Sequence, residues 1–353
     1  MWDQGLSKDF AATLCNQRKH NNIPKTAKVG LILSIVQAII VIILELAVLI
    51  KLINGLSPFK WLKYWSTDKS PLAYSLLFVV AMFFSVYLFA GAVVQENTLQ
   101  LISFIMFHIF ILVWSVFIHY NIQNSMWEKY DPGLFSQVKS ITIAVSIIIG
   151  VTLTVWSYIC YKLYRLYGWE MYKLIGANYH IREMYKEYLL LVQLLKLNYF
   201  TFAGFAIQYT VLVLKSTDTE FYITVALIPI SLLVLVASYY ALKRESAALM
   251  WAFIFGMNGC IGYYVFKIAR MYDSRQHSKY SGVRAIMTFF GIISLILIVV
   301  TVFQAIICLT NFGQGLLKQM ELIKGVPSDI MSNGPSFYIN SAGERRMALE
   351  EYN

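Results

Sequence analysis

Charge is scarce in this chain of 353 residues: 14% of them are Asp, Glu, Lys or Arg, whereas 58% are hydrophobic. A soluble domain carries about a quarter charged residues and fewer than half apolar ones, so the composition excludes an ordinary soluble protein. Proline and glycine are also few, at 7 and 19 residues, which excludes collagen-like and low-complexity disordered chains. A membrane protein with many spans is the class that remains.

Reactive motifs are lacking as well. The four cysteines are isolated, and none of them forms the Cys-x-x-Cys pair typical of zinc or redox sites. The sequence has no HExxH, GxSxG or P-loop motif. We therefore expect a protein that is not an enzyme and that has no metal or cofactor. The net charge of +10 is spread over many short segments, which argues against nucleic-acid binding.

Long apolar runs, by contrast, fill most of the chain. Each is long enough to cross a hydrocarbon core of ~30 Å as a helix, and backbone groups in lipid need the internal hydrogen bonds of a helix. The sequence therefore predicts an all-α, polytopic transmembrane helix bundle. Its expected spans, about eight in number, are Val29–Ile53, Leu72–Val94, Leu99–Ile118, Ile141–Cys160, Leu189–Leu214, Phe221–Leu242, Ala247–Phe266 and Ala285–Thr310.

Polar sequence borders this bundle, which we place at residues 29–317. Residues 1–28 form a polar N-terminal segment, and 318–353 are expected to be a flexible tail with a short terminal helix from Gly343 onward. An even number of spans puts both termini on one side. That side carries more Lys and Arg, so the positive-inside rule places both termini in the cytosol. The loop Lys267–Arg284 is also rich in basic residues, which leaves a miscounted span as the alternative.

The connection 161–188 carries a basic stripe. Its Lys162, Arg165, Trp169 and Lys173 share one helical face, with aromatic residues largely on the other. Such an amphipathic helix would lie on an anionic cytosolic leaflet, with Lys162, Arg165 and Lys173 at the membrane surface. A plain helical extension of the fourth span, with a solvated polar face, explains the same pattern.

Polar residues inside the apolar runs are the candidate functional groups, because an ionisable side chain in lipid costs at least about 2.5–3.5 kcal/mol on insertion scales. We expect Lys196 to face the interior, with Glu45, Gln193 or an amide such as Gln304 as partner. These groups either fix helix packing or line an ion or proton pathway. The full set is Glu45, His108, Gln193, Lys196, Asn198, Gln208, Gln304 and Asn311.

Several strings in the second half form a recognisable order. They are Tyr167-Gly-Trp-Glu-Met-Tyr-Lys-Leu-Ile-Gly-Ala-Asn178, Ile181-Arg-Glu-Met-Tyr185, Leu194-Leu-Lys-Leu-Asn-Tyr-Phe200, Gly204-Phe-Ala-Ile-Gln208 and Cys308-Leu-Thr-Asn-Phe-Gly-Gln-Gly-Leu-Leu317. This order resembles an uncharacterised fungal family of multi-pass Golgi apparatus membrane proteins. The resemblance runs from about Ile141 to Leu317. It implies a location in the Golgi membrane, but no mechanism.

Two functions from different classes fit these features. The first is a non-enzymatic structural or trafficking role, with the lipid bilayer and either protein partners or a homo-oligomer as partners. The alternative is a transporter or channel that uses polar groups around Glu45 and Lys196. A transporter should contain a broken helix or a midplane cavity, whereas a scaffold should have a filled core. The sequence shows no repeat of 20–50 residues and no inverted similarity between its halves. This absence slightly disfavours a transporter.

Overall fold

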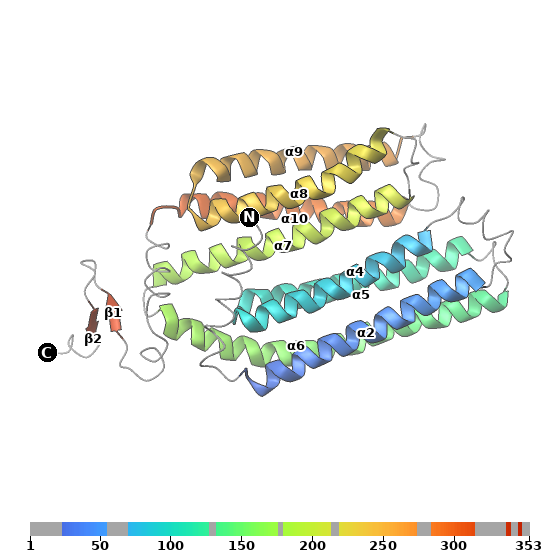
Figure 1. Cartoon of the computed structure of the whole chain (residues 1–353), viewed down its shortest axis with the longest axis horizontal. Coiled ribbons are helices and arrows are strands. Elements are labelled where there is room, and N and C mark those ends of the chain that lie inside the picture. Colours follow the sequence, from blue (N-terminus) through green and yellow to red (C-terminus); the bar gives the residue numbers. More distant parts are fainter. Residues whose placement is uncertain are drawn as a thin grey trace, which may run out of the picture.

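The computed structural model describes residues 23–54, 70–126, 132–175, 179–212, 219–273, 284–314, 337–339 and 345–347. Within these ranges the chain forms eight helices and two short strands (Figure 1). The helices are α2 (Lys25–Asn54), α4 (Ser70–Val94), α5 (Thr98–Met126), α6 (Pro132–Ile175), α7 (Tyr179–Leu212), α8 (Thr219–Lys243), α9 (Ala247–Met271) and α10 (Arg284–Thr310).

Each expected span coincides with one of these helices, so the predicted helix bundle is confirmed. Among the described residues, 7 helices are long and apolar enough to cross a membrane. The remaining helix, α8, is 25 residues long. Its apolar segment Pro229–Lys243 is shorter than the candidate spans. Seven of the expected spans thus fall on helices that can cross a membrane, and the remaining one, Phe221–Leu242, falls on α8.

Two helices are longer than the apolar runs that predicted them. Helix α6 continues without a break from the fourth span to Ile175, so the first part of the connection 161–188 is an extension of that span. Helix α9 continues to Met271 and takes Lys267 out of the loop in which the sequence placed it. The basic loop before α10 is therefore shorter than expected, which weakens its conflict with the positive-inside rule.

The helices are arranged as two units of four. In the first unit α2 packs on α4, α4 on α5, α5 on α6, and α6 again on α2. In the second unit α7, α8, α9 and α10 close in the same order. The two units lie side by side and meet where α7 packs on α4 and α5 (Figure 1). Because α2 and α7 begin at the same end of the bundle, the units form a parallel repeat and not an inverted one.

The turns within the two units have the same backbone structure. Glu96 joins α4 to α5 with φ 50°, and Glu245 joins α8 to α9 with φ 49°. After each glutamate, a backbone N–H returns to an alanine carbonyl: Asn97 to Ala92 at 3.1 Å, and Ser246 to Ala241 at 2.9 Å. Ala92, Glu96 and Asn97 of the first turn therefore correspond to Ala241, Glu245 and Ser246 of the second. The separation along the chain is the same for all three pairs. The repeating unit of four helices is much longer than the repeats of 20–50 residues that are absent from the sequence.

Aromatic side chains fill the seam between the units. The ring of Phe200 on α7 stacks on Phe84 of α4 at 5.0 Å and packs edge-on against Phe107 of α5 at 4.9 Å. Nearby, Phe290 on α10 packs against Trp114 and Phe110 of α5, at 5.1 and 5.5 Å. Because rings in such geometries add to the free energy of burial, these aromatic contacts help to hold the two units together.

A two-stranded antiparallel hairpin lies outside the helix bundle. Its strands are β1 (Phe337–Ile339) and β2 (Arg345–Met347), with Tyr338 opposite Arg346. The prediction of a terminal helix from Gly343 onward is therefore wrong over Arg345–Met347, because the β-forming run Phe-Tyr-Ile offers these residues a strand partner. The rest of the predicted tail 318–353, and residues 1–22 of the polar N-terminal segment, lie outside the described residues.

Both ends of the bundle chain are expected on the same side of the membrane. The start of α2 and the end of α10 lie at the same end of the helices (Figure 1). Tags fused to the two termini of the protein should therefore show the same sensitivity to protease in sealed Golgi vesicles, and the charge bias predicts cleavage of both from the cytosolic side. Protection of one tag alone would contradict the even number of crossings.

Candidate functional site at the junction of the units

Lys196 on α7 lies where the two units meet and is half-buried there. Its ammonium donates a hydrogen bond to the side-chain carbonyl oxygen of Gln100 on α5, at 3.0 Å. The same oxygen accepts a bond from the amide of Gln193, one turn earlier on α7, at 3.3 Å. The ring of Tyr87 lies 5.9 Å from the ammonium, at the outer limit of a cation–π contact. Lys196 thus has a polar partner on another helix, as expected, but the partner is Gln100.

Gln100 is held in place by its own helix hairpin. It is fully buried in the first turn of α5, and its amide nitrogen donates to the backbone carbonyl of Leu88 on α4 at 2.8 Å. The side chain of Asn97 caps this turn by accepting from the Leu99 N–H at 2.9 Å. Gly91 on α4 leaves the space that the Gln100 amide fills, since a Cβ there would collide with it. Gln100 was not among the predicted site residues, because a single glutamine at the start of an apolar run is typical of an interfacial residue.

Glu45 belongs to a different contact. It is buried on α2 and accepts a hydrogen bond from Ser75 of α4 at 2.9 Å. Ser75 and Leu88 lie about 20 Å apart along α4 at ~1.5 Å per residue, so Glu45 is far from the Lys196 cluster. Glu45 is therefore not the partner of Lys196, and a single pathway built from both residues does not match this geometry. The sequence does not show how α2 is aligned with α7, so the distance between Glu45 and Lys196 could not be predicted from it.

His108 on α5 packs inside the first unit. Its ring lies 4.2 Å from the ring of Phe104, and its Nδ1 is 3.1 Å from the Phe104 carbonyl oxygen. Its Nε2 is 3.5 Å from the hydroxyl of Ser85 on α4. Beside it, the indole of Trp156 donates to the Gln37 carbonyl oxygen of α2 at 2.6 Å. These contacts link the four helices of the unit, and the described residues hold no group of three metal-ligating side chains.

Asn198 and Gln304 join the first and last helices of the second unit. The buried Asn198 amide donates to the Thr301 hydroxyl of α10 at 2.5 Å. The Gln304 amide donates to the carboxylate and, at 3.2 Å, to the backbone carbonyl of Glu187 on α7. Both residues act as interhelical hydrogen-bonding groups, and neither lies in the Lys196 cluster.

Gln208 is the unusual amide of the set. It is completely buried on α7, and neither its nitrogen nor its oxygen has a hydrogen-bond partner. It lies one turn after Gly204, where an added Cβ would collide with Phe290 of α10 and crowd Leu77 of α4. An unpaired buried amide costs roughly 1–3 kcal/mol, so Gln208 lowers the stability of the bundle.

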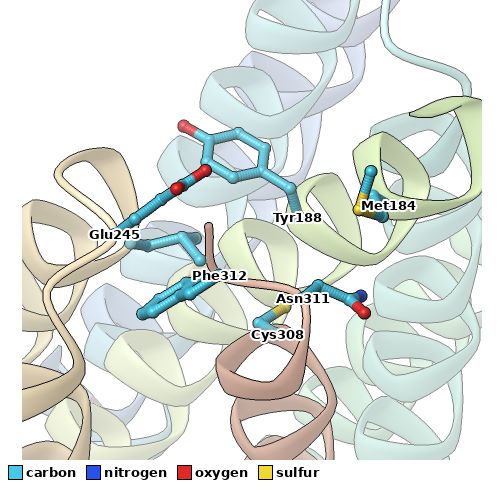
Figure 2. A pocket seen from close by; sticks show the side chains of 7 residues that line it. Met184, Tyr188, Glu245, Cys308, Asn311 and Phe312 are labelled. Carbon is cyan, nitrogen blue, oxygen red and sulfur yellow. The ribbon is translucent and has the colours of Figure 1, made fainter. Parts of the chain in front are cut away.

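Asn311 lines a small cavity at the end of the second unit. The cavity measures about 20 Å³, enough for about one water molecule, and opens between α7, the α8–α9 turn and the end of α10 (Figure 2). Glu245 closes this end by accepting a hydrogen bond from the Gly313 backbone N–H at 3.0 Å. The other lining residues are Met184, Tyr188, Leu242, Cys308 and Phe312. A cavity of this size does not admit a substrate.

Lys267 is a second buried cation, although the sequence predicted that it lies in a loop. It is 5% exposed on α9, and its ammonium donates to the Tyr209 hydroxyl of α7 at 2.9 Å. The ammonium also lies 4.2 Å from the centre of the Tyr209 ring and 5.5 Å from that of Tyr263. The spacing of Tyr263 and Lys267, one helical turn apart, is the signal that could have placed it inside the bundle.

The predicted surface residues Lys162 and Arg165 are exposed on the extension of α6. Leu163 and Tyr167 on the same stretch are buried, so this extension packs against the rest of the protein. Trp169 is 57% exposed. The side chain of Lys173 lies outside the described residues. The helical part of the prediction is confirmed, and contact with a leaflet stays a prediction.

The fold and its buried polar contacts define a multi-pass helical membrane protein. Over 282 residues, the chain is 28% identical to the UPF0658 Golgi apparatus membrane protein C23H3.04 of Schizosaccharomyces pombe. The match covers 72% of this chain and 79% of the yeast protein. It confirms the resemblance to an uncharacterised fungal family and the location in the Golgi apparatus membrane. No family model and no solved structure matches the chain.

Proposed function

We propose that this protein is a non-enzymatic structural or trafficking component of the Golgi membrane. The observation that carries the proposal is the filled seam between the units. Phe84, Phe107 and Phe200 pack ring against ring there, at centroid distances of 4.9–5.0 Å. A transporter that works by rocking its halves needs a seam that opens, and this packing would have to be lost at each cycle.

The polar groups at the seam support the same proposal. Lys196 and Gln193 of α7 both donate to the side-chain oxygen of Gln100, so these two hydrogen bonds hold α7 against α5. Such contacts fix helix register, which is the usual role of interhelical polar groups in membranes. A rigid bundle of this kind presents its outer helix faces to lipid and to other membrane proteins.

A transporter is the second candidate, and the parallel repeat favours it. Transporters built from parallel repeats bind their substrate where the repeats meet, and Lys196 lies at that junction. A substrate site at Lys196 would not include Glu45, because Glu45 contacts Ser75 in the first unit.

Replacing Lys196 by methionine separates the two candidates. Methionine keeps the length of the side chain and removes its charge, and apolar isosteres of buried polar groups are often neutral for stability. In cells that lack the native gene, K196M should reach the Golgi at normal abundance. It should also restore the normal set of resident Golgi membrane proteins, measured by quantitative proteomics of purified Golgi membranes.

Failure of a correctly located and abundant K196M protein to restore that set would contradict the structural role and favour the transporter. Lys51→Met is the matched control. Lys51 lies near the end of α2, and its ammonium donates to Gln137 of α6 at an exposed position. Its replacement removes the same charge away from the seam.

A further inference from the structure

The first unit packs against the second through one face of α5. The equivalent face of the second unit, on α9, is exposed. On α5, Phe107 and Phe110 pack against Phe200 of α7, with centroid distances of 4.9 and 6.4 Å. The constant separation that relates the two turns makes Gly256 and Gly259 the counterparts of these phenylalanines on α9. Both glycines are exposed, and a Cβ on either would meet no atom within 4 Å.

In the first unit, the residue of α2 that corresponds to Phe200 is likewise exposed. Gln37 on α2 and Asn198 on α7 are equivalent, because each bonds the first helix of its unit to the fourth, through Trp156 and Thr301 respectively. Two residues further on, Ile39 corresponds to Phe200, and Ile39 is 52% exposed. The exposed residues in register with it on α2 are Ile32, Ile35 and Ile43.

We propose that copies of this chain associate head to tail in the membrane, with α2 of one copy packed against the glycine-lined face of α9 in the next. The contact repeats the junction between the two units, with isoleucine side chains against exposed glycines in place of aromatic rings against each other. Small residues on one helix permit the close backbone approach that helix pairs in membranes use. The proposal gives the structural role proposed above a partner, a second copy of the protein.

The geometry of the repeat fits such an assembly. Both units begin at the same end of the bundle, so applying the same operation again keeps every copy in one orientation across the bilayer. A contact between two different faces is heterologous, and it propagates into a ring or an open chain. It does not stop at a symmetric dimer. The helices that would form it, α2 and α9, are also among the least buried of the candidate spans.

Disulfide cross-linking of the full-length chain tests the contact directly. In a variant whose native cysteines are replaced by alanine, I39C and G256C together should cross-link in oxidised native membranes. The expected result is a ladder of dimers, trimers and larger species on non-reducing gels. Each single variant should stay monomeric, as should I39C combined with F303C, because Phe303 is 66% exposed on α10 and lies outside the proposed contact.

Two results would overturn the proposal. Dimers of G256C alone would show a symmetric contact between two α9 helices, and the absence of any ladder in the double variant would show that α9 faces lipid or a different protein. Neither result bears on the K196M rescue experiment, so failure of the assembly and failure of the structural role remain distinguishable.

A second measurement retains the native cysteines. Gly259→Leu should fill the exposed face, and it should reduce co-purification of two differently tagged copies at least tenfold without changing the yield of folded protein. Gly262→Leu is the matched control, because its counterpart on α5, Val113, is 47% exposed and lies off the junction. Equal co-purification of the Gly259→Leu and wild-type proteins would overturn the contact.

Discussion

Replacing Gly204 by alanine is expected to lower the stability of the protein by about 1–3 kcal/mol, the usual cost of forcing extra atoms into a packed core. A Cβ at this position would lie 2.8 Å from one carbon of the Phe290 ring and 3.2 Å from a methyl carbon of Leu77. Phe290 is completely buried and is itself wedged between Trp114 and Phe110, so it has no free direction in which to move. The added methyl group should therefore push the two units apart.

Denaturant unfolding of the purified protein, followed by tryptophan fluorescence, measures the loss. Gly262→Ala on α9 is the control, because a Cβ there meets no atom within 4 Å. Alanine also favours a helix over glycine by up to about 1 kcal/mol, so this variant should be at least as stable as the wild type. A Gly204→Ala protein of unchanged stability would show that the seam is loosely packed, and it would remove the main support for a rigid scaffold.

Gln100→Leu should be the second strongly destabilising change, at about 1–3 kcal/mol, because it leaves buried polar groups without partners. Leucine fills a similar volume but offers no acceptor to the ammonium of Lys196 or to the amide of Gln193. Lys196→Met alone should cost much less, since it removes the group that needs the acceptor. The asymmetry arises because Q100L leaves an ammonium without an acceptor in an apolar seam, whereas in K196M the Gln100 oxygen still accepts from the Gln193 amide.

The double variant Q100L with K196M provides the check. If Lys196 and Gln100 interact, adding K196M should recover the part of the stability lost in Q100L that comes from the unpaired ammonium, and unfolding of the four proteins gives the coupling free energy directly. Additive effects would contradict the contact between the two side chains. Gln304→Leu with K196M is a suitable control, because Gln304 binds Glu187 in another part of α7.

The spans were predictable because lipid leaves the chain few choices. An apolar run of sufficient length must be a helix in the hydrocarbon core, and this rule alone predicted helices close to α4, α5 and α10. The helix ends were less predictable. Helix α9 continues past Phe266 to bury Lys267 against Tyr209, a favourable contact that hydropathy does not register, since it scores lysine only as a charge.

The polar residues were located by sequence, but their contacts were not. Hydropathy identified Lys196 and Gln193 as residues in need of partners, since burying them has a cost wherever they lie in the membrane. Which partner satisfies them depends on the register of α7 against α5, which is set by the rings of Phe107, Phe200 and Phe290. A single sequence does not contain that register, and for this reason Gln100 was missed and Glu45 was considered in its place.

The sequence by itself determined the class of protein, the approximate positions of the described helices and the need for an internal polar contact, because each of these follows from transfer of one chain segment into lipid. Only the tertiary structure decided that the helices form two parallel units with matching turns at Glu96 and Glu245. It also decided which faces are filled with rings and which, at Gly256 and Gly259, remain open. The reason is physical: every lipid-compatible residue scores alike in hydropathy, whereas packing depends on the shape that each side chain presents to its neighbour.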